Sequence, residues 1–482
     1  MLFRSFIANQ SVPVEQIEQD LRLIKKYSSC VRTYGVSQGL EAVPAIAQKL
    51  AMKVKLGAWI SRDAVGNQLE LTTALSLAQR YVGTVDTLIV GNEVLLRKEL
   101  SVNQLAALLD RARANTTVPV TYADVWEFWL RNPQLANHVD FVGIHILPFW
   151  EDHPVSREHA VNHVLTIAQR VQQAFPNKRV WVGETGWPSA GRQRGPAKPS
   201  VVEQTMFIWQ MLGALEKQSE FKNLSINFIE AFDQPWKRHL EGAMGGYWGV
   251  LDANGEPKFS LSGAQREDSF WPQPVMFTMA LTAFLGFIGG FFYGEKGKVL
   301  RGFFCSGCAC AATGLIAMIA QYGVLWNRSA TEWGLFLVAQ GSVVFYSASL
   351  MVDKKIQVAR QLLQTAALFC IAAQVLCLAF DARYRGFNTA LLVVPVLFLL
   401  LHMMQRNKGT APLIARSSDY FLLFVIATSS VAVLVQEGLQ NTQALGFVTA
   451  SLVLVGGLLF AFDAFKKAIP DNSSATDARS VQ

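Results

Sequence analysis

The spacing of apolar positions divides the chain of 482 residues into two parts. Up to about residue 270, short β-rich apolar runs alternate with amphipathic stretches, and beyond it long apolar runs follow one another. Short apolar runs are typical of buried strands, whereas runs of about 20 residues are long enough to cross a bilayer as helices. We therefore expect a domain of strands and helices over residues 1–270, a transmembrane helical domain over 271–465 and a polar tail over 466–482.

The first part contains seven strand-like runs, and a shorter run near Leu2–Phe6 makes an eighth. The seven are Cys30–Tyr34, Lys53–Trp59, Thr87–Gly91, Val118–Tyr122, Val139–His145, Arg179–Gly183 and Leu224–Ile229. Helical patterns fill the gaps between them. A strand followed by a helix, repeated eight times, predicts an α/β fold of the (β/α)8 TIM barrel type rather than a doubly wound sheet.

The second part contains seven apolar runs, each near the length of a membrane span. They lie at about 274–293, 302–326, 333–351, 362–380, 386–404, 419–436 and 444–462. Lys and Arg alternate along the connections: the odd connections and the tail carry twelve, and the even ones three. The positive-inside rule then predicts a multi-pass inner-membrane protein with a cytoplasmic tail and an extracytoplasmic barrel.

Export of a folded domain requires a signal, and the chain starts at Met1 without a charged n-region and an apolar h-region. We therefore expect a missing upstream segment, with a cytoplasmic barrel as the alternative. The fraction of hydrophobic residues, 51%, and the mean hydropathy of +0.24 agree with a protein whose second partner is the lipid bilayer.

The net charge of +7 belongs mainly to the membrane part, because residues 274–482 hold 15 Lys and Arg against 9 Asp and Glu and so carry +6 of it. Positive charges between apolar runs act as topology signals, and we expect no nucleic-acid partner. Cys30 is the only cysteine of the first part, which excludes a disulfide within that domain. The Cys305–Cys310 stretch favours packing of small residues in a helix over a metal or redox site.

Polar residues follow the predicted strands, at the edge where a barrel has its active site. They are Asn92, Glu93, His145, Glu184, Glu230 and Asp233. Glycosidic bonds are cut with two carboxyl groups, and Glu93 and Glu184 would face each other across the barrel mouth. A separation of about 5 to 5.5 Å would mean retention of configuration through a covalent glycosyl intermediate. This chemistry requires neither a metal nor a cofactor, and we expect neither.

Aromatic residues also gather at the strand ends, where they could stack on sugar rings along a groove. They are Tyr34, Trp59, Tyr122, Trp126, Trp150, Trp187 and Trp236. For any one of them, packing in the core is the alternative. As a set they favour an extended neutral carbohydrate over a small metabolite.

Three motifs in this order resemble glycoside hydrolase family 17, which contains β-1,3-glucanases and glucanosyltransferases. They are Gly91-Asn92-Glu93, Val182-Gly183-Glu184-Thr185-Gly186-Trp187-Pro188-Ser189 and Glu230-Ala231-Phe232-Asp233-Gln234-Pro235-Trp236-Lys237. The resemblance covers most of residues 12–260 and includes Val31-Arg32-Thr33-Tyr34. Within the family, the chain is most similar to bacterial membrane-anchored proteins of the β-glucan synthase type.

The resemblance implies that Glu93 is the acid/base and Glu184 the nucleophile, with Asn92 on the sugar 2-hydroxyl. It also implies a supporting network of Glu230, Asp233 and Lys237, for which a plain ion-pair cluster is the alternative. Gln234 stands where the family more often has Glu, and the first strand begins closer to Met1 than in the family pattern.

The function expected from these features is a retaining β-1,3-glucan glycosidase or transglycosylase of β-glucan synthesis or remodelling, including β-1,6 branching. A glucan synthase would be its protein partner. A plain endo-β-1,3-glucanase would use the same intermediate and pass the sugar to water. A membrane glucan-binding sensor would not need both Glu93 and Glu184. A nucleotide-sugar-dependent synthase would need an Asp-x-Asp-type metal site, which is not evident in the sequence.

Overall fold

The computed structural model describes residues 11–218, 221, 223–260, 263–265, 323, 325–349, 357–381, 384–389, 391–392, 395–396 and 415–466. The chain forms two compact units, residues 1–267 and 268–482. Each unit is described by itself.

The first unit contains a sheet of seven parallel strands that follow one another in chain order. The strands are β1 (Cys30–Arg32), β2 (Lys53–Ala58), β3 (Val85–Asn92), β4 (Val120–Val125), β5 (Val142–His145), β6 (Val180–Thr185) and β7 (Ser225–Phe228). This arrangement confirms the predicted TIM-like barrel. The strand predicted at Leu2–Phe6 lies outside the described residues.

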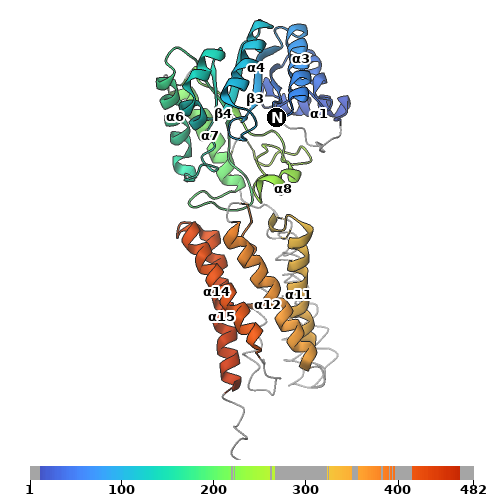
Figure 1. The fold of residues 1–482 in the computed structure, drawn as a ribbon, viewed down its shortest axis with the longest axis vertical. Coiled ribbons are helices and arrows are strands. Elements are labelled where there is room, and N and C mark those ends of the chain that lie inside the picture. Colours follow the sequence, from blue (N-terminus) through green and yellow to red (C-terminus); the bar gives the residue numbers. More distant parts are fainter. Residues whose placement is uncertain are drawn as a thin grey trace, which may run out of the picture. The chain divides into compact units, whose positions relative to one another are not determined.

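Helices lie outside the strands, as Figure 1 shows for α3, α4 and α6. The α-helices of this unit are α1 (Val14–Ile24), α2 (Val43–Lys49), α3 (Ala64–Arg80), α4 (Val102–Ala114), α5 (Trp126–Arg131), α6 (Arg157–Ala174), α7 (Val201–Lys217) and α8 (Arg238–Glu241). The 3-10 turns are η1 (Leu40–Ala42), η2 (Pro133–His138) and η4 (Pro235–Lys237).

Local sequence explains where several helices begin. Ser101 caps α4 in a capping box with Gln104, and Asp63 and Ser200 cap α3 and α7 through their side-chain oxygens. The strands bury apolar side chains on both faces: in β3, Leu88 has no exposed surface, and the next residue, Ile89, on the other face, is 2% exposed. Strands of this kind need cover on both sides, and the surrounding helices provide part of it.

The pairing register shifts close to the carboxyl ends of β3, β5 and β6. After these shifts Asn92 pairs with Ala123, His145 with Glu184 and Thr185 with Phe228. Irregularities of this kind turn a side chain away from its regular direction and are frequent beside active sites. They bring the polar ends of neighbouring strands together at one edge of the sheet.

The described residues of the second unit form four long helices side by side (Figure 1): α11 (Ala330–Ser349), α12 (Gln357–Phe380), α14 (Ser417–Glu437) and α15 (Thr442–Lys466). Among the helices that the structure describes, three segments are long and apolar enough to cross a membrane, namely Val358–Phe380, Ser417–Glu437 and Thr442–Phe462. The four helices coincide with the third, fourth, sixth and seventh predicted spans. The first predicted span and the Cys305–Cys310 stretch lie outside the described residues, as do most of the second and fifth spans.

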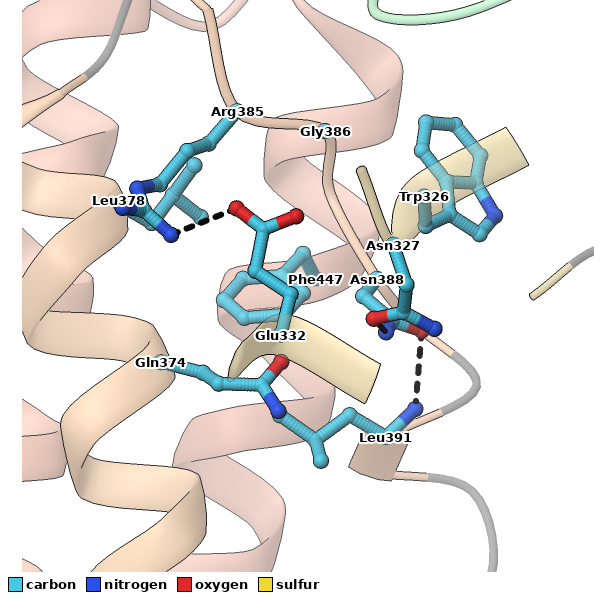
Figure 2. A pocket seen from close by; sticks show the side chains of 10 residues that line it. All are labelled: Trp326, Asn327, Glu332, Gln374, Leu378, Arg385, Gly386, Asn388, Leu391 and Phe447. Carbon is cyan, nitrogen blue, oxygen red and sulfur yellow. Dashed lines mark hydrogen bonds and ion pairs between the residues drawn. The ribbon is translucent and has the colours of Figure 1, made fainter. Parts of the chain in front are cut away.

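A polar pocket lies where α11 begins and the segment after α12 folds back (Figure 2). Glu332 accepts from Arg385 Nη1 at 2.7 Å and from Arg328 Nη2 at 3.2 Å, and Asn388 Nδ2 donates to Asn327 Oδ1 at 3.2 Å. These contacts tie the beginning of α11 to the segment that follows α12. We assign them a structural role in the helical unit.

Candidate active site

The centre of the candidate site is Glu184 near the end of β6. Its side chain is 5% exposed. Its Oε1 accepts from Arg32 Nη1 at 3.1 Å and from the Tyr34 hydroxyl at 2.9 Å. Arg32 also donates to Gly183 O at 2.8 Å, and its guanidinium lies over the Tyr34 ring at 4.7 Å. The carboxylate is therefore held in one orientation by charged and neutral donors from β1 and the residues after it.

Glu93 follows the last residue of β3 and faces Glu184 across the His145 ring. His145 Nδ1 is 2.8 Å from Glu93 Oε1, and its Nε2 is 3.5 Å from Glu184 Oε1. Asn92 Oδ1 accepts from Arg32 Nη2, so that β1 contacts both candidate strand ends. The Glu93 side chain is 21% exposed, which leaves it accessible from outside.

The two carboxylates are close to each other. A carboxylate oxygen of Glu93, one of Glu184 and a ring nitrogen of His145 all lie within 4.8 Å of one another. This spacing would suit a metal ion. However, the Arg32 guanidinium, 3.1 Å from Glu184 Oε1 and 3.3 Å from His145 Nε2, places a permanent positive charge between two of the three groups and opposes a cation there.

The surroundings of Glu184 favour its charged form. Burial by itself raises the pKa of this carboxyl, but His145, Arg32 and the hydrogen bond from Tyr34 outweigh burial and hold the pKa below its usual value. The pKa of the Tyr34 hydroxyl is well above its usual value because of burial and the nearby Glu184 charge, so Tyr34 remains a donor.

The residues after β7 form two buried ion pairs. Lys237 Nζ lies 3.0 Å from Glu230 Oε2, and the attraction of Glu230 raises the pKa of Lys237 although burial opposes it. Lys258 Nζ lies 2.8 Å from Asp233 Oδ1. Burial raises the pKa of Asp233 to about 6, although Lys258 opposes the shift. The predicted grouping of Glu230, Asp233 and Lys237 is thus divided between two pairs, one of which contains Lys258.

Five of the seven predicted aromatic residues retain exposed surface, namely Tyr34, which contacts Glu184, and four tryptophans. Trp59 is 41% exposed, and the Arg97 guanidinium lies over its ring at 4.3 Å. Arg97 also donates to the Asn92 carbonyl at 2.9 Å. Trp126, Trp150 and Trp236 are half-buried. Of these residues, Trp59 is tied most directly to the strand that ends at Asn92.

Two predicted sugar-stacking residues belong to the core instead. Tyr122 is 1% exposed, and its hydroxyl contacts Asp124 and the Leu95 amide. Trp187 is also 1% exposed, and its ring packs against Phe149 at 5.4 Å. The structure places Tyr122 and Trp187 in the core, which is the alternative given for each aromatic residue, and their rings have no exposed face.

The sequence prediction of the site omitted Arg32 and Arg97. A charged residue inside a strand with apolar neighbours, as in Val31-Arg32-Thr33, is a signal that could have identified Arg32, because a buried Arg needs an anionic or carbonyl partner. Arg97 had no comparable signal, since its contacts with Trp59 and Asn92 depend on the turn after β3.

The chain matches known glycosidases over its first half. Residues 6–249, half of the chain, match the family model of the BtgE/BtgC glycoside hydrolase domain. A glucan 1,3-beta-glucosidase of Schizosaccharomyces pombe is 29% identical over 259 residues, which are 50% of this chain and 79% of the relative. One from Candida albicans is 26% identical over 52% of this chain and 86% of its own length.

Among solved structures, the glycoside hydrolase family 17 beta-1,3-glucanosyltransferase of Rhizomucor miehei is 27% identical. The match covers 53% of this chain and 94% of that protein, with a TM-score of 0.47. The glycosidase motifs and the family model cover the same part of the chain, the part that folds as the barrel. The chain therefore belongs to the family of the BtgE/BtgC glycoside hydrolase domain and is an enzyme of the glycoside hydrolase class.

Proposed function

We propose that this chain is a membrane-anchored, retaining β-1,3-glucan transglycosylase that works through a covalent glycosyl ester on Glu184. The observation that carries the proposal is the separation of the two carboxylates, within 4.8 Å between oxygens of Glu93 and Glu184. Inverting glycosidases hold their carboxyl groups about 6.5–9.5 Å apart to leave room for water, whereas retaining ones hold them about 5–5.5 Å apart. The short separation supports direct attack by one carboxylate.

Glu184 is the nucleophile in this proposal. It is ionised because its pKa lies below the usual value. Oε1 accepts from both Arg32 and Tyr34, and Oε2 makes no hydrogen bond within the described part of the chain. Oε2 is therefore the oxygen that attacks the anomeric carbon, while the donors on Oε1 fix the direction of approach.

Glu93 is the acid/base, and it retains access to the outside. In the first step the Glu184 oxygen forms a bond to the anomeric carbon, the glycosidic C–O bond breaks, and Glu93 gives its proton to the leaving oxygen. In the second step Glu93 takes the proton of an acceptor hydroxyl, whose oxygen displaces Glu184 from the same carbon. The acceptor oxygen belongs to a sugar in transfer and to water in hydrolysis.

Asn92 holds the sugar 2-hydroxyl in this proposal. Its Oδ1 accepts from Arg32, so its amide nitrogen is available as a donor toward the substrate. Trp59, whose ring is backed by Arg97, supplies a stacking surface next to Asn92. Trp126, Trp150 and Trp236 are the remaining candidates for stacking along the groove.

The substrate class follows from the relatives. The two glucan 1,3-beta-glucosidases described above match over the barrel, so a β-1,3-glucan is the substrate that the shared fold and motifs support best. Stacking surfaces favour a sugar over water as acceptor, because they raise its effective concentration at the glycosyl ester. Transfer to O3 of a glucosyl residue extends the chain, and transfer to O6 creates a β-1,6 branch.

The membrane location belongs to the same proposal. Three apolar helices in the described part of the chain support anchoring in a bilayer. The alternation of Lys and Arg along the predicted connections favours an extracytoplasmic barrel with a cytoplasmic tail. A transglycosylase held at the membrane would receive new glucan from a neighbouring synthase. That reaction class, polymerisation from an activated sugar, is the one that has to precede remodelling.

Incubation of the purified full chain with linear β-1,3-glucan oligosaccharides, without any nucleotide sugar, tests the proposal. Longer or branched products are expected from the parent protein, and none from Glu184→Gln, whose amide lacks the nucleophile but keeps nearly the same shape. Glu158→Gln, an exposed change outside the site, serves as the control and should be fully active. Only shortened products at millimolar substrate would leave a plain glucanase, and an active Glu184→Gln protein would exclude the assigned nucleophile.

A further inference from the structure

Behind Glu93 lies a buried polar pair from β4 that takes no part in the bond-forming steps. Asp124 and Tyr122 are 0% and 1% exposed, and the Tyr122 hydroxyl donates to Asp124 Oδ2. Burial raises the pKa of Asp124 to about 6 against the opposing effect of this hydrogen bond. A carboxyl group enclosed in this way is costly unless its oxygens are fully used.

The oxygens of this pair are used by the turn that follows Glu93. Asp124 Oδ2 accepts from the Leu95 amide at 3.3 Å and from the Leu96 amide at 3.4 Å. The Tyr122 oxygen accepts from the same Leu95 amide at 3.0 Å. The pair therefore holds the backbone two and three residues after Glu93.

This turn needs such support because Glu93 has a left-handed backbone, with φ of 53°. For a residue other than glycine, this conformation costs roughly 1–2 kcal/mol. It persists only where the surrounding structure enforces it. The Glu93 amide is bonded to Ala123 O at 2.8 Å, which anchors one side of the turn to β4. Asp124 and Tyr122 anchor the other side to the same strand.

We infer that Asp124 and Tyr122 are positioning residues, which hold residues 93–96 so that the Glu93 carboxyl meets the leaving and attacking oxygens. This inference rests on the proposed role of Glu93 as acid/base. Both side chains are buried and act on Glu93 through the backbone of the turn. Substitution of Asp124 or Tyr122 impairs the proton transfer by Glu93 and spares the attack by Glu184. A substrate whose leaving group needs no proton therefore still reacts when Glu93 is misplaced.

Asp124→Asn tests the inference. Oδ2 accepts three donors and Oδ1 accepts the Val125 amide, so either orientation of an Asn amide opposes an N–H or O–H group. The value of kcat/KM for nitrophenyl β-laminaribioside should fall about tenfold to a hundredfold, whereas the dinitrophenyl compound, which leaves without acid, should change less than about threefold. Azide, which attacks without a base, should raise kcat on the dinitrophenyl compound.

The matched control is Asp140→Asn, since Asp140 Oδ2 accepts the Val120 amide at 2.7 Å at the opposite end of β4. The burst of dinitrophenol gives the concentration of active sites, and all rates are divided by it, so that misfolded protein does not affect the comparison. If Asp124→Asn does not fold, Tyr122→Phe, which removes only the hydroxyl, should show the same dependence on the leaving group at smaller size.

Glu93→Ala provides the reference for lost acid/base catalysis. Glu93→Ala is expected to show the leaving-group dependence and azide rescue. If it does, and Asp124→Asn and Tyr122→Phe lower kcat/KM equally for both substrates or for neither, the positioning inference is overturned. If Glu93→Ala itself shows neither effect, the proposed function fails at Glu93, a result distinct from the first.

Discussion

The hydrogen bond from the Tyr34 hydroxyl to Glu184 Oε1 is one of the contacts on which the proposed nucleophile depends. It stabilises the charged carboxylate in a site from which water is largely removed. Arg32 supplies the second donor and the positive charge. At this scale the sequence indicated Glu93, Glu184 and Asn92, because acidic and amide groups after strands are visible in a motif. It did not indicate their partners, which depend on pairing between distant strands.

Tyr34→Phe should make Glu184 a less effective nucleophile while leaving its carboxylate in place. Loss of a hydrogen bond to a charged group costs about 1.5 kcal/mol or more, roughly a tenfold fall in kcat/KM. The hydroxyl lowers the pKa of Glu184, so its removal raises that pKa and moves the acidic limb of the kcat/KM profile to higher pH. The profile of Tyr27→Phe, an exposed tyrosine after α1, should match the parent. An unmoved acidic limb in Tyr34→Phe would contradict the assigned contact.

Trp59 and Trp187 should respond to replacement in opposite ways. Trp59→Ala removes an exposed stacking face and should raise KM for β-1,3-oligosaccharides about fivefold, a loss of about 1 kcal/mol, with little change in stability. Trp187→Ala opens a cavity in the core and should lower the free energy of unfolding by about 3–5 kcal/mol. Denaturant unfolding measures the stability of each variant, and initial rates measure its KM. A raised KM for folded Trp187→Ala at unchanged stability would show that Trp187 binds the sugar.

At the scale of elements, all seven described strands fall on predicted runs, with ends that differ by at most three residues. Parallel strands buried on both faces appear in the sequence as continuous apolar runs, which is why they could be located. The largest difference at a carboxyl end is that of β4, which continues to Val125, three residues beyond the predicted Tyr122. Polar Asp124 interrupts the apolar pattern there, and the same residue supports the turn after β3, a contact between strands that no single run encodes.

Within the helical unit, Asp419 at the beginning of α14 connects this helix to α12. Asp419 is fully buried and accepts from Gln364 Nε2 at 2.9 Å and Thr365 Oγ1 at 2.7 Å, both on α12. Asp419→Ala leaves these α12 donors without that acceptor and should destabilise the packed helices by about 1 kcal/mol. Thermal unfolding in detergent measures the loss, with the exposed Ser418→Ala as control. Equal stability of the two variants would show that the contact contributes nothing.

At the scale of the whole molecule, the chain combines a glycosidase barrel with a helical unit, whose described part has three segments long and apolar enough to cross a membrane. The sharp change in hydropathy near residue 270 is the basis of the predicted domain boundary. The orientation is a separate prediction, which depends on charges in connections. A reporter fused after Gln482 should be cytoplasmic, and external protease should cleave the barrel in intact cells. A protected barrel in the native full-length product would reverse the orientation.

The central claim is that Glu184 forms a covalent bond with the sugar. A 2-deoxy-2-fluoro-β-laminaribiosyl fluoride has a good leaving group, and its fluorine slows turnover of the glycosyl enzyme, so the intermediate accumulates. Peptide mass spectrometry after this treatment should find one added glycosyl group on the side chain of Glu184, and none in Glu184→Gln. A label on a different carboxylate, or rapid turnover of the reagent with inversion and no labelled peptide, would contradict the account.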